Sequence, residues 1–208
     1  MRRYATEFIG TFFLVFTVCA AVLSGASLAP LAIGAVLAAM IFAGGHISGG
    51  HYNPAVSLAA YVRGQLGLID LACYAAAQLL GGIVAAFLAR YVISVRPERF
   101  TIANDDLLRA FLVELLFTFA LAYVVLNVAT SRDHLNNSFY GLAIGLTVLA
   151  GAVAVGGISG GAFNPAVGVG VVVATIASVN VLWIYLVATL AGGAAAGVVF
   201  RLLNPDDK

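Results

Sequence analysis

The chain contains two Asn-Pro-Ala triplets, Asn53-Pro54-Ala55 and Asn164-Pro165-Ala166, each at the end of a Gly-rich stretch. The stretches 45–56 and 156–167 match at 9 of 12 positions, because only positions 46, 51 and 52 differ from their counterparts. An asparagine after an irregular stretch can cap a helix, and a proline suits the first helical turn, which needs no amide donor. Each triplet therefore predicts the start of a helix and an uncharged Asn amide that can donate a hydrogen bond to a small molecule.

The composition indicates an integral membrane protein. Hydrophobic residues make up 62% of the 208 residues, charged residues make up 9%, and the mean hydropathy is +1.06. A soluble domain carries about 25% charged residues to cover its water-facing surface. The net charge is +1 and the basic residues are scattered, which argues against a nucleic-acid partner.

Apolar runs bounded by Gly, Pro or charged residues predict the transmembrane helices. Their expected ranges are 4–23, 30–44, 68–93, 107–129, 139–155 and 181–203. After the second and fifth of these spans, the Asn-Pro-Ala triplets open the stretches 54–61 and 165–174, which are too short to cross a bilayer. The prediction is an all-α membrane protein with six spans and two re-entrant half-helices.

The two halves of the chain repeat each other. Glu7 in the first span corresponds to Glu114 in the fourth, and each is followed by Thr and Leu at the same spacing. Each half, about 1–93 and 107–203, holds three spans and one half-span. Because three is odd, the second half must enter the membrane in the opposite sense, which is an inverted-topology repeat.

The duplicated motif also predicts a pore. Irregular backbone at membrane depth is stable only where protein buries it or where it lines a water-filled cavity. Inversion would turn the two half-helix N-termini toward each other at the bilayer midplane, where their partial positive charges repel cations. Asn53 and Asn164 facing a narrow pore would hold the oxygen of a passing water and interrupt a proton wire. We therefore expect a single transmembrane channel domain over 1–208.

The basic residues suggest an orientation. With the N-terminus inside, the inner side carries Arg2, Arg3, Arg63, Arg132, Arg201 and Lys208. The outer side then carries Arg90, Arg96, Arg99 and Arg109, around a 94–106 connection whose residues, Pro97 and Glu98 among them, suit a solvated surface. The excess of basic residues inside predicts a multi-pass protein of the cell (inner) membrane with both termini cytoplasmic.

With its paired Asn-Pro-Ala boxes, six spans and paired glutamates, the chain resembles the aquaporins of the major intrinsic protein family over essentially its whole length. The resemblance implies a right-handed bundle of tilted helices in which the two half-helices meet at the centre. It implies a homotetramer with one pore per subunit. Water, small neutral solutes and the lipid bilayer are the expected partners, and no cofactor or metal ion is expected.

The residue after the second box departs from most of the family. Most members have an Arg there, which narrows the outer pore and supplies donors, whereas this chain has Val167. By the family's spacing, the other filter positions are Ile33, Ala152 and Gly161, and strict water channels typically have an aromatic residue and His at the first two. The resemblance therefore implies a wide apolar filter. Such a filter would pass water and solutes such as glycerol, urea, ammonia or hydrogen peroxide while excluding ions.

Neighbouring positions bear on the substrate class. The Val after the second box is similar to that of plant vacuolar-membrane aquaporins and of some bacterial aquaporins associated with arsenic resistance. Glycerol facilitators typically place Asp where this chain has Gly168, so their signature is absent. Tyr185 matches an aromatic position of water channels, but Leu186 replaces their usual Trp. A strict water channel, narrowed by a loop carbonyl or by Phe163, is the alternative interpretation.

Glu7, Glu114, His46 and His51 each allow more than one role. The glutamates could relay protons, but we favour carboxylates that support the adjacent Asn-Pro-Ala loops by accepting their backbone hydrogen bonds. The histidines are expected in a loop near the inner pore mouth. They could form a metal site or a pH gate, and the simpler interpretation is hydrogen-bonded residues that line the inner vestibule.

Three other function classes compete with a channel. An alternating-access transporter also uses inverted repeats, but it needs coupling charges at the midplane, and Glu7 and Glu114 lie near span ends. A structural membrane protein with a vestigial pore would fill the lumen with bulky side chains, whereas the predicted ring is small. The sequence shows no Ser-His-Asp set, metal cluster or phosphate loop, so enzyme activity is not expected.

Overall fold

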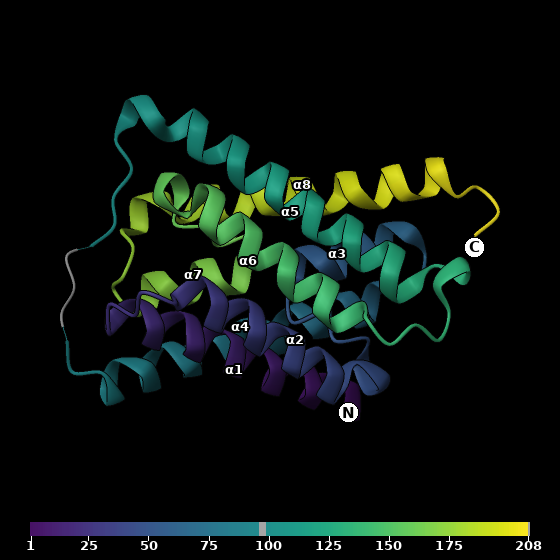
Figure 1. Ribbon diagram of the computed structural model, residues 1–208, viewed down its shortest axis with the longest axis horizontal. Helices are drawn as coiled ribbons and strands as arrows, with labels where there is room; N and C mark the ends of the chain where they lie inside the picture. Colours follow the sequence, from purple (N-terminus) through teal and green to yellow (C-terminus); the bar gives the residue numbers. More distant parts are fainter. Residues whose placement is uncertain (96–98, 208) are drawn as a thin grey trace.

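The computed structural model describes residues 1–95 and 99–207 as a bundle of helices (Figure 1). The helices are α1 Arg2–Leu23, α2 Ala29–Ser48, α3 Pro54–Arg63, α4 Leu68–Val92, α5 Leu107–Thr130, α6 Tyr140–Ser159, α7 Pro165–Val173 and α8 Leu182–Leu203. Short 3-10 turns lie at Asn104–Asp106, Arg132–His134 and Val179–Val181. The expectations for Arg96, Pro97, Glu98 and Lys208 concern positions outside the described residues.

Six of the described helices are long and apolar enough to cross a membrane, namely α1, α2, α4, α5, α6 and α8, with α5 and α8 counted together with the 3-10 turns before them. Helices α3 and α7 have only 10 and 9 residues and rise about 1.5 Å per residue, so neither can span a bilayer. The predicted fold of six spans and two half-helices is confirmed.

Helices α2 and α6 extend one turn further than predicted. They end at Ser48 and Ser159, and each closes at a left-handed glycine, Gly49 with φ 91° and Gly160 with φ 89°. The first turn of each Gly-rich stretch stays helical because backbone groups at membrane depth must find their partners within the protein. His46 therefore lies in the last turn of α2, and the prediction that it belongs to a loop is wrong.

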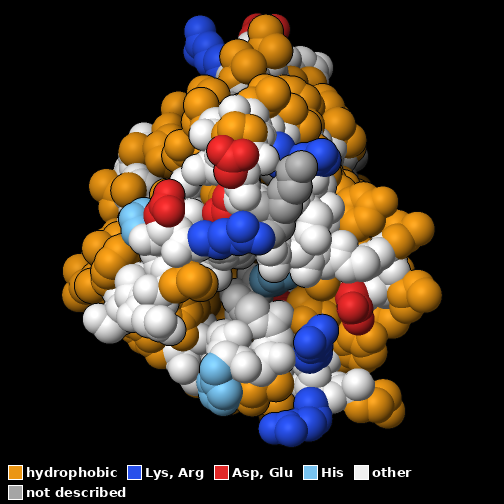
Figure 2. Space-filling view, turned by 90° about the vertical axis from the view of Figure 1, so that its right-hand side faces the viewer, with side chains coloured by type: hydrophobic (Ala, Val, Ile, Leu, Met, Phe, Trp, Pro, Cys, Tyr) orange, Lys and Arg blue, Asp and Glu red, His pale blue; other side chains and the backbone are white. Residues whose placement is uncertain are grey.

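Both termini lie at one end of the bundle, and the connection between α4 and α5 lies at the opposite end (Figure 1). Figure 2 shows the end that carries the termini: Arg, Asp, Glu and His side chains gather on this face, and hydrophobic side chains form the flanks. The face is hollowed near its centre. An apolar flank between polar ends is what a bilayer requires of a spanning bundle.

Small residues bring the helices of each half into close contact. Helix α1 packs on α4, and α5 packs on α8. A Cβ added at Gly81 of α4 would lie 2.6 Å from the Phe8 carbonyl oxygen, and one at Gly192 of α8 would lie 2.4 Å from the Leu115 carbonyl oxygen. These distances are too short for any side chain, so glycine sets the helix spacing in both halves.

Candidate pore and filter positions

Asn53 and Asn164 cap the two half-helices in the same way. Each has an extended backbone, with φ −158° at Asn53 and −160° at Asn164. The Asn53 side-chain oxygen accepts a hydrogen bond from the Ala55 amide at 2.9 Å, and that of Asn164 accepts one from the Ala166 amide at 2.8 Å. Pro54 and Pro165 occupy the first helical position, where a missing amide hydrogen costs nothing.

The two asparagine amides also join the halves of the repeat. Asn53 Nδ2 donates to the Phe163 carbonyl, and Asn164 Nδ2 donates to the Tyr52 carbonyl, both at 2.9 Å. Tyr52 and Phe163 reach these positions with φ of 48° and 47°, a left-handed conformation that bulky residues rarely adopt. An amide group carries two hydrogens, so each Asn has a second one besides that used in this bond, and both side chains line one cavity.

Glu7 is fully buried and holds the loop that leads to Asn53. Its Oε1 accepts hydrogen bonds from Ser48 Oγ at 2.6 Å and from the His51 amide at 3.0 Å. Its Oε2 accepts hydrogen bonds from the Tyr52 amide at 2.7 Å and from Gln78 Nε2 at 2.8 Å. Four donors therefore converge on this carboxylate and fix the loop around it.

Glu114 makes the corresponding bonds in the second half. Its Oε1 accepts hydrogen bonds from Ser159 Oγ at 2.7 Å and from the Ala162 amide at 2.9 Å, and its Oε2 accepts one from the Phe163 amide at 2.7 Å. Thr189 stands at the position that Gln78 has in the first half, and its hydroxyl donates to the Tyr185 carbonyl of its own helix. The second loop is therefore held by one donor fewer than the first.

A cavity of about 300 Å³ contains both asparagines and all four predicted filter positions. None of its described lining residues is Asp, Glu, Lys or Arg. Two of the filter positions are neighbours, because a Cβ built on Gly161 would lie 3.6 Å from the Ala152 Cα. The lining includes Ile33, His51, Asn53, Phe100, Ala152, Gly160, Gly161, Asn164, Val167, Ala177 and Tyr185.

The two histidines lie in different surroundings. His51 lines the cavity, its Nδ1 lies 3.0 Å from Ser57 Oγ, and its ring meets the Tyr74 ring edge-on at a centroid distance of 5.3 Å. His46 is exposed on α2 and is not among the residues that line the cavity. The two side chains are therefore not arranged as a pair around the cavity.

Residues 1–200 match the family model described as Major intrinsic protein. The chain belongs to the major intrinsic protein family. Over 217 residues it is 36% identical to the "Glycerol uptake facilitator protein-like 6" of Lactiplantibacillus plantarum, and the match covers the whole of both chains. It is 34% identical to "Nodulin-26" of Glycine max, with 100% of this chain and 80% of that protein covered.

The fold of this family member is similar to the X-ray structure of the aquaglyceroporin from Plasmodium falciparum. The TM-score is 0.83 at 26% identity, and the match covers 98% of this chain and 97% of that chain. Major intrinsic proteins and aquaglyceroporins are channels, so this chain is a multi-pass membrane channel for water or small solutes and not an enzyme. The transporter and structural-protein interpretations are therefore set aside.

The structure brings two aromatic residues to the cavity that the sequence did not assign to the filter. Tyr185 of α8 lines it and donates a hydrogen bond to the Ser159 carbonyl at 2.6 Å. A Cβ added at Gly168 would lie 2.4 Å from the Tyr185 Cβ, so the position where glycerol facilitators carry Asp has no room for a side chain here. The second residue, Phe100, lies in the connection between α4 and α5, and no local pattern marks it.

Proposed function

We propose that the chain is a passive channel that conducts water and small uncharged solutes, such as glycerol, urea, ammonia or hydrogen peroxide, and excludes ions. The observation that carries this proposal is the cavity of about 300 Å³ that holds both asparagines and has no charged residue among its described lining. An apolar cavity with a few uncharged donors suits neutral polar molecules.

The filter of this channel is the ring of Ile33, Ala152, Gly161 and Val167. Small and aliphatic side chains leave room that an Arg at position 167 would occupy, and they offer no fixed donors to a solute. A passing solute therefore finds its hydrogen bonds at Asn53 and Asn164 rather than at the ring. Molecules with an apolar carbon skeleton, such as glycerol, lose less hydration in such a ring than an ion does.

Ion exclusion follows from the same lining. An ion in this cavity loses more hydration than the two Asn amides replace, at a cost of several kcal/mol or more. The N-termini of α3 and α7 add partial positive charge at the centre, which opposes cations. Asn53 and Asn164 act as donors toward the central water, so the chain of hydrogen bonds that a proton would follow is interrupted there.

The relatives support the solute class. One relative of 36% identity is named a glycerol uptake facilitator-like protein, and the similar solved structure is named an aquaglyceroporin. We further propose, by likeness to the family, a homotetramer in the cell membrane with both termini in the cytoplasm. Glu7 and Glu114 support the two loops, and His51 contributes to the inner part of the pore.

The test is stopped-flow light scattering on liposomes that contain the full chain. Sucrose reports water efflux by shrinkage, and glycerol and urea report solute entry by reswelling. Fast shrinkage with reswelling supports the proposal. Fast shrinkage without reswelling would establish the alternative, a strict water channel, and shrinkage no faster than that of empty liposomes would reject a conducting channel.

A pair of variants tests the filter within the same assay. Val167→Arg adds bulk and charge at the ring, and Val167→Met adds bulk alone. We expect Val167→Arg to reduce glycerol and urea entry by about tenfold while water efflux stays measurable, and Val167→Met to have a smaller effect. If Val167→Arg admits glycerol and urea as fast as the parent does, Val167 is not a filter residue.

A further inference from the structure

Helix α3 packs against glycines of α8 along its length. A Cβ on Gly193 would lie 2.3 Å from the Ala55 carbonyl oxygen, and one on Gly197 would lie 2.7 Å from the Val62 Cβ. Glycine presents no side chain that interlocks with the facing helix, so these contacts fix the distance between α3 and α8 more than the position of α3 along its axis. That axial position, and with it the place of Asn53 at the N-terminus of α3, depends on what holds the two ends of the helix.

Hydrogen bonds to other elements hold both ends of α3. At the N-terminal end, Asn53 Nδ2 donates to the Phe163 carbonyl at 2.9 Å. At the C-terminal end, Arg63 Nε donates to Thr130 Oγ1 at 2.9 Å, and its Nη2 donates to the Thr130 carbonyl, at the end of α5, at 3.0 Å. A helix of 10 residues is about 15 Å long, so Arg63 holds one end of a short rod whose other end carries Asn53.

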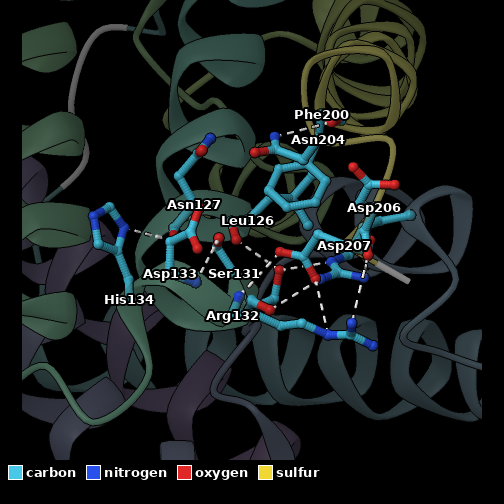
Figure 3. Close-up of polar contacts among 12 residues, drawn as sticks. Leu126, Asn127, Ser131, Arg132, Asp133, His134, Phe200, Asn204, Asp206 and Asp207 are labelled. Carbon is cyan, nitrogen blue, oxygen red and sulfur yellow. Dashed lines mark hydrogen bonds and ion pairs between the residues drawn. The ribbon is translucent and has the colours of Figure 1, made fainter.

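Arg63 is a buried charge with a single carboxylate partner among the described residues. Its side chain is 1% exposed, and its Nη2 lies 2.7 Å from Asp207 Oδ1. Asp207 belongs to the segment after α8, and it also accepts a hydrogen bond from the Arg132 amide, in the turn between α5 and α6 (Figure 3). A buried charge that loses its partner is strongly unfavourable. Without the Asp207 charge, Arg63 would therefore move toward water and draw the end of α3 with it.

The second half-helix is anchored by backbone bonds instead. The repeat places Ala174 at the position of Arg63. In the segment after α7, the Ile176 carbonyl accepts from the Phe100 amide at 2.7 Å, and the Ser178 amide donates to the Phe100 carbonyl at 3.0 Å. Such bonds do not depend on the charge of a side chain. A change at Asp207 therefore acts on the half-helix that carries Asn53 and leaves the one that carries Asn164 in place.

We propose that Asp207 is a positioning residue of the pore, which acts through Arg63 and α3 to hold the Asn53 amide in place. The inference rests on the proposed solute channel and adds to it a dependence of conduction on the segment after α8. Loss of the Asp207 charge lets α3 shift and displaces the Asn53 donor from its place in the cavity. Urea entry then falls more than water efflux, because a larger solute tolerates less displacement of the groups that line its path.

The test measures water efflux and urea entry in the same liposomes, for the parent, Asp207→Asn and Asp207→Glu. The ratio of the two rates does not depend on how many channels are folded, so a contact that only stabilises the fold would leave the ratio unchanged. We expect Asp207→Asn to lower the ratio of urea entry to water efflux by about threefold. Asp207→Glu keeps the charge and should retain most of the parental ratio.

The matched control is Asp106→Asn, which removes an ion pair that has no contact with a half-helix. The Asp106 carboxylate lies 2.9 Å from Arg109 Nη1, both side chains are exposed, and the pair lies toward the opposite end of the bundle. This variant should keep the parental ratio. Arg63→Lys tests the link to α3, because lysine keeps the charge but lacks the fork that reaches both Thr130 and Asp207. It should lower the ratio as Asp207→Asn does.

The outcomes separate this inference from the proposed function. If Asp207→Asn and Arg63→Lys melt at lower temperatures but keep the parental ratio, Asp207 is a structural contact only, and the channel proposal stands. Should Asp207→Asn not fold, the ratio in Arg63→Lys decides the question. If the parent admits no urea, the solute proposal fails. The activation energy of water efflux, which also does not depend on the number of channels, then tests the inference: we expect it to rise in Asp207→Asn, and a parental value would reject the positioning role.

Discussion

At the residue scale, each asparagine of the Asn-Pro-Ala boxes performs separate tasks with separate atoms. The oxygen of Asn164 caps α7, while its nitrogen donates to the Tyr52 carbonyl of the other half and lines the cavity. Aspartate would keep the cap, because a carboxylate oxygen also accepts from the Ala166 amide. The substitution replaces the donor with a charged acceptor, so it tests the role of the uncharged amide nitrogen.

We expect Asn164→Asp to lower the free energy of unfolding by roughly 1–3 kcal/mol, because a carboxylate oxygen would face the Tyr52 carbonyl in place of a donor. We also expect a cation leak, because the negative charge lies in an otherwise uncharged cavity. Thermal melting in detergent and a potassium-flux assay in liposomes measure the two effects.

Asn180→Asp is the control, since Asn180 is exposed in the 3-10 turn before α8. If Asn164→Asp melts at the temperature of the parent and admits no more potassium than the parent does, the role assigned to the amide nitrogen is contradicted.

At the element scale, two glycine contacts set where each half-helix lies against the spanning helices. A Cβ on Gly193 of α8 would lie 2.3 Å from the Ala55 carbonyl oxygen in the first turn of α3. A Cβ on Gly82 of α4 would lie 2.9 Å from the Ala166 carbonyl oxygen in the first turn of α7. In each case a spanning helix touches the backbone of an Asn-Pro-Ala box, so the position of the Asn depends on the size of a residue far away in the sequence.

Gly193→Ala should displace α3 because the new methyl group meets backbone, which cannot rotate away. We expect a loss of stability of about 1–3 kcal/mol and a clear fall in water efflux. Gly157→Ala in α6 is the matched control, because a Cβ there meets nothing within 4 Å and alanine favours a helix. If the two variants melt at the same temperature with equal flux, the contact at Gly193 does not set the position of α3.

At the scale of the whole molecule, the C-terminal end of α3 is bound to the segment that follows α8. Arg63, the last residue of α3, donates to Thr130 Oγ1 at 2.9 Å and to Asp207 Oδ1 at 2.7 Å, and its guanidinium lies 4.7 Å from the centre of the Phe200 ring. Figure 3 shows Asp207 beside Arg132, whose backbone amide donates to Asp207 Oδ2 at 3.0 Å. The repeat places Ala174 at the position of Arg63, and the α7 end is instead tied to Phe100, so the two half-helices are anchored by different means.

The Asp207 contact predicts a pH dependence. Partial burial acts to raise the pKa of Asp207, but hydrogen bonds from the Arg132 amide and the Arg63 guanidinium outweigh it and lower the pKa. A lowered folded-state pKa means that the stabilisation is fully present above the unfolded-state pKa of roughly 3.9 and is lost as the pH falls through the folded-state value. The contact should therefore stabilise the protein at neutral pH and not in strong acid.

Asp207→Asn should lower the free energy of unfolding at pH 7 by about 1–3 kcal/mol, because Arg63 loses its charged partner. The difference from the parent should shrink as the pH falls below about 4. Thermal melting across this range measures it. Asp206→Asn is the control, since Asp206 offers its backbone carbonyl to Arg132 at 3.4 Å. If Asp207→Asn lowers the stability by the same amount at neutral and at acidic pH, the ion pair is not the cause of the loss.

The sequence by itself determined the membrane class, the spanning segments and the duplicated half-helices, because hydrophobic length and the Asn-Pro-Ala boxes are local signals. It also predicted hydrogen bonds from the box loops to Glu7 and Glu114, since the repeat places a carboxylate in each half. The filter positions Ile33, Ala152, Gly161 and Val167 came from family spacing and remain predictions about selectivity.

Only the tertiary structure decided the contacts between segments distant in sequence. The left-handed conformations of Tyr52 and Phe163 depend on carbonyls that must reach an asparagine in the other half. The place of Phe100 depends on pairing with the segment after α7, and that of His46 on how far α2 continues into the Gly-rich stretch. Such features arise from packing and long-range hydrogen bonds, which hydrophobic periodicity and local motifs do not encode.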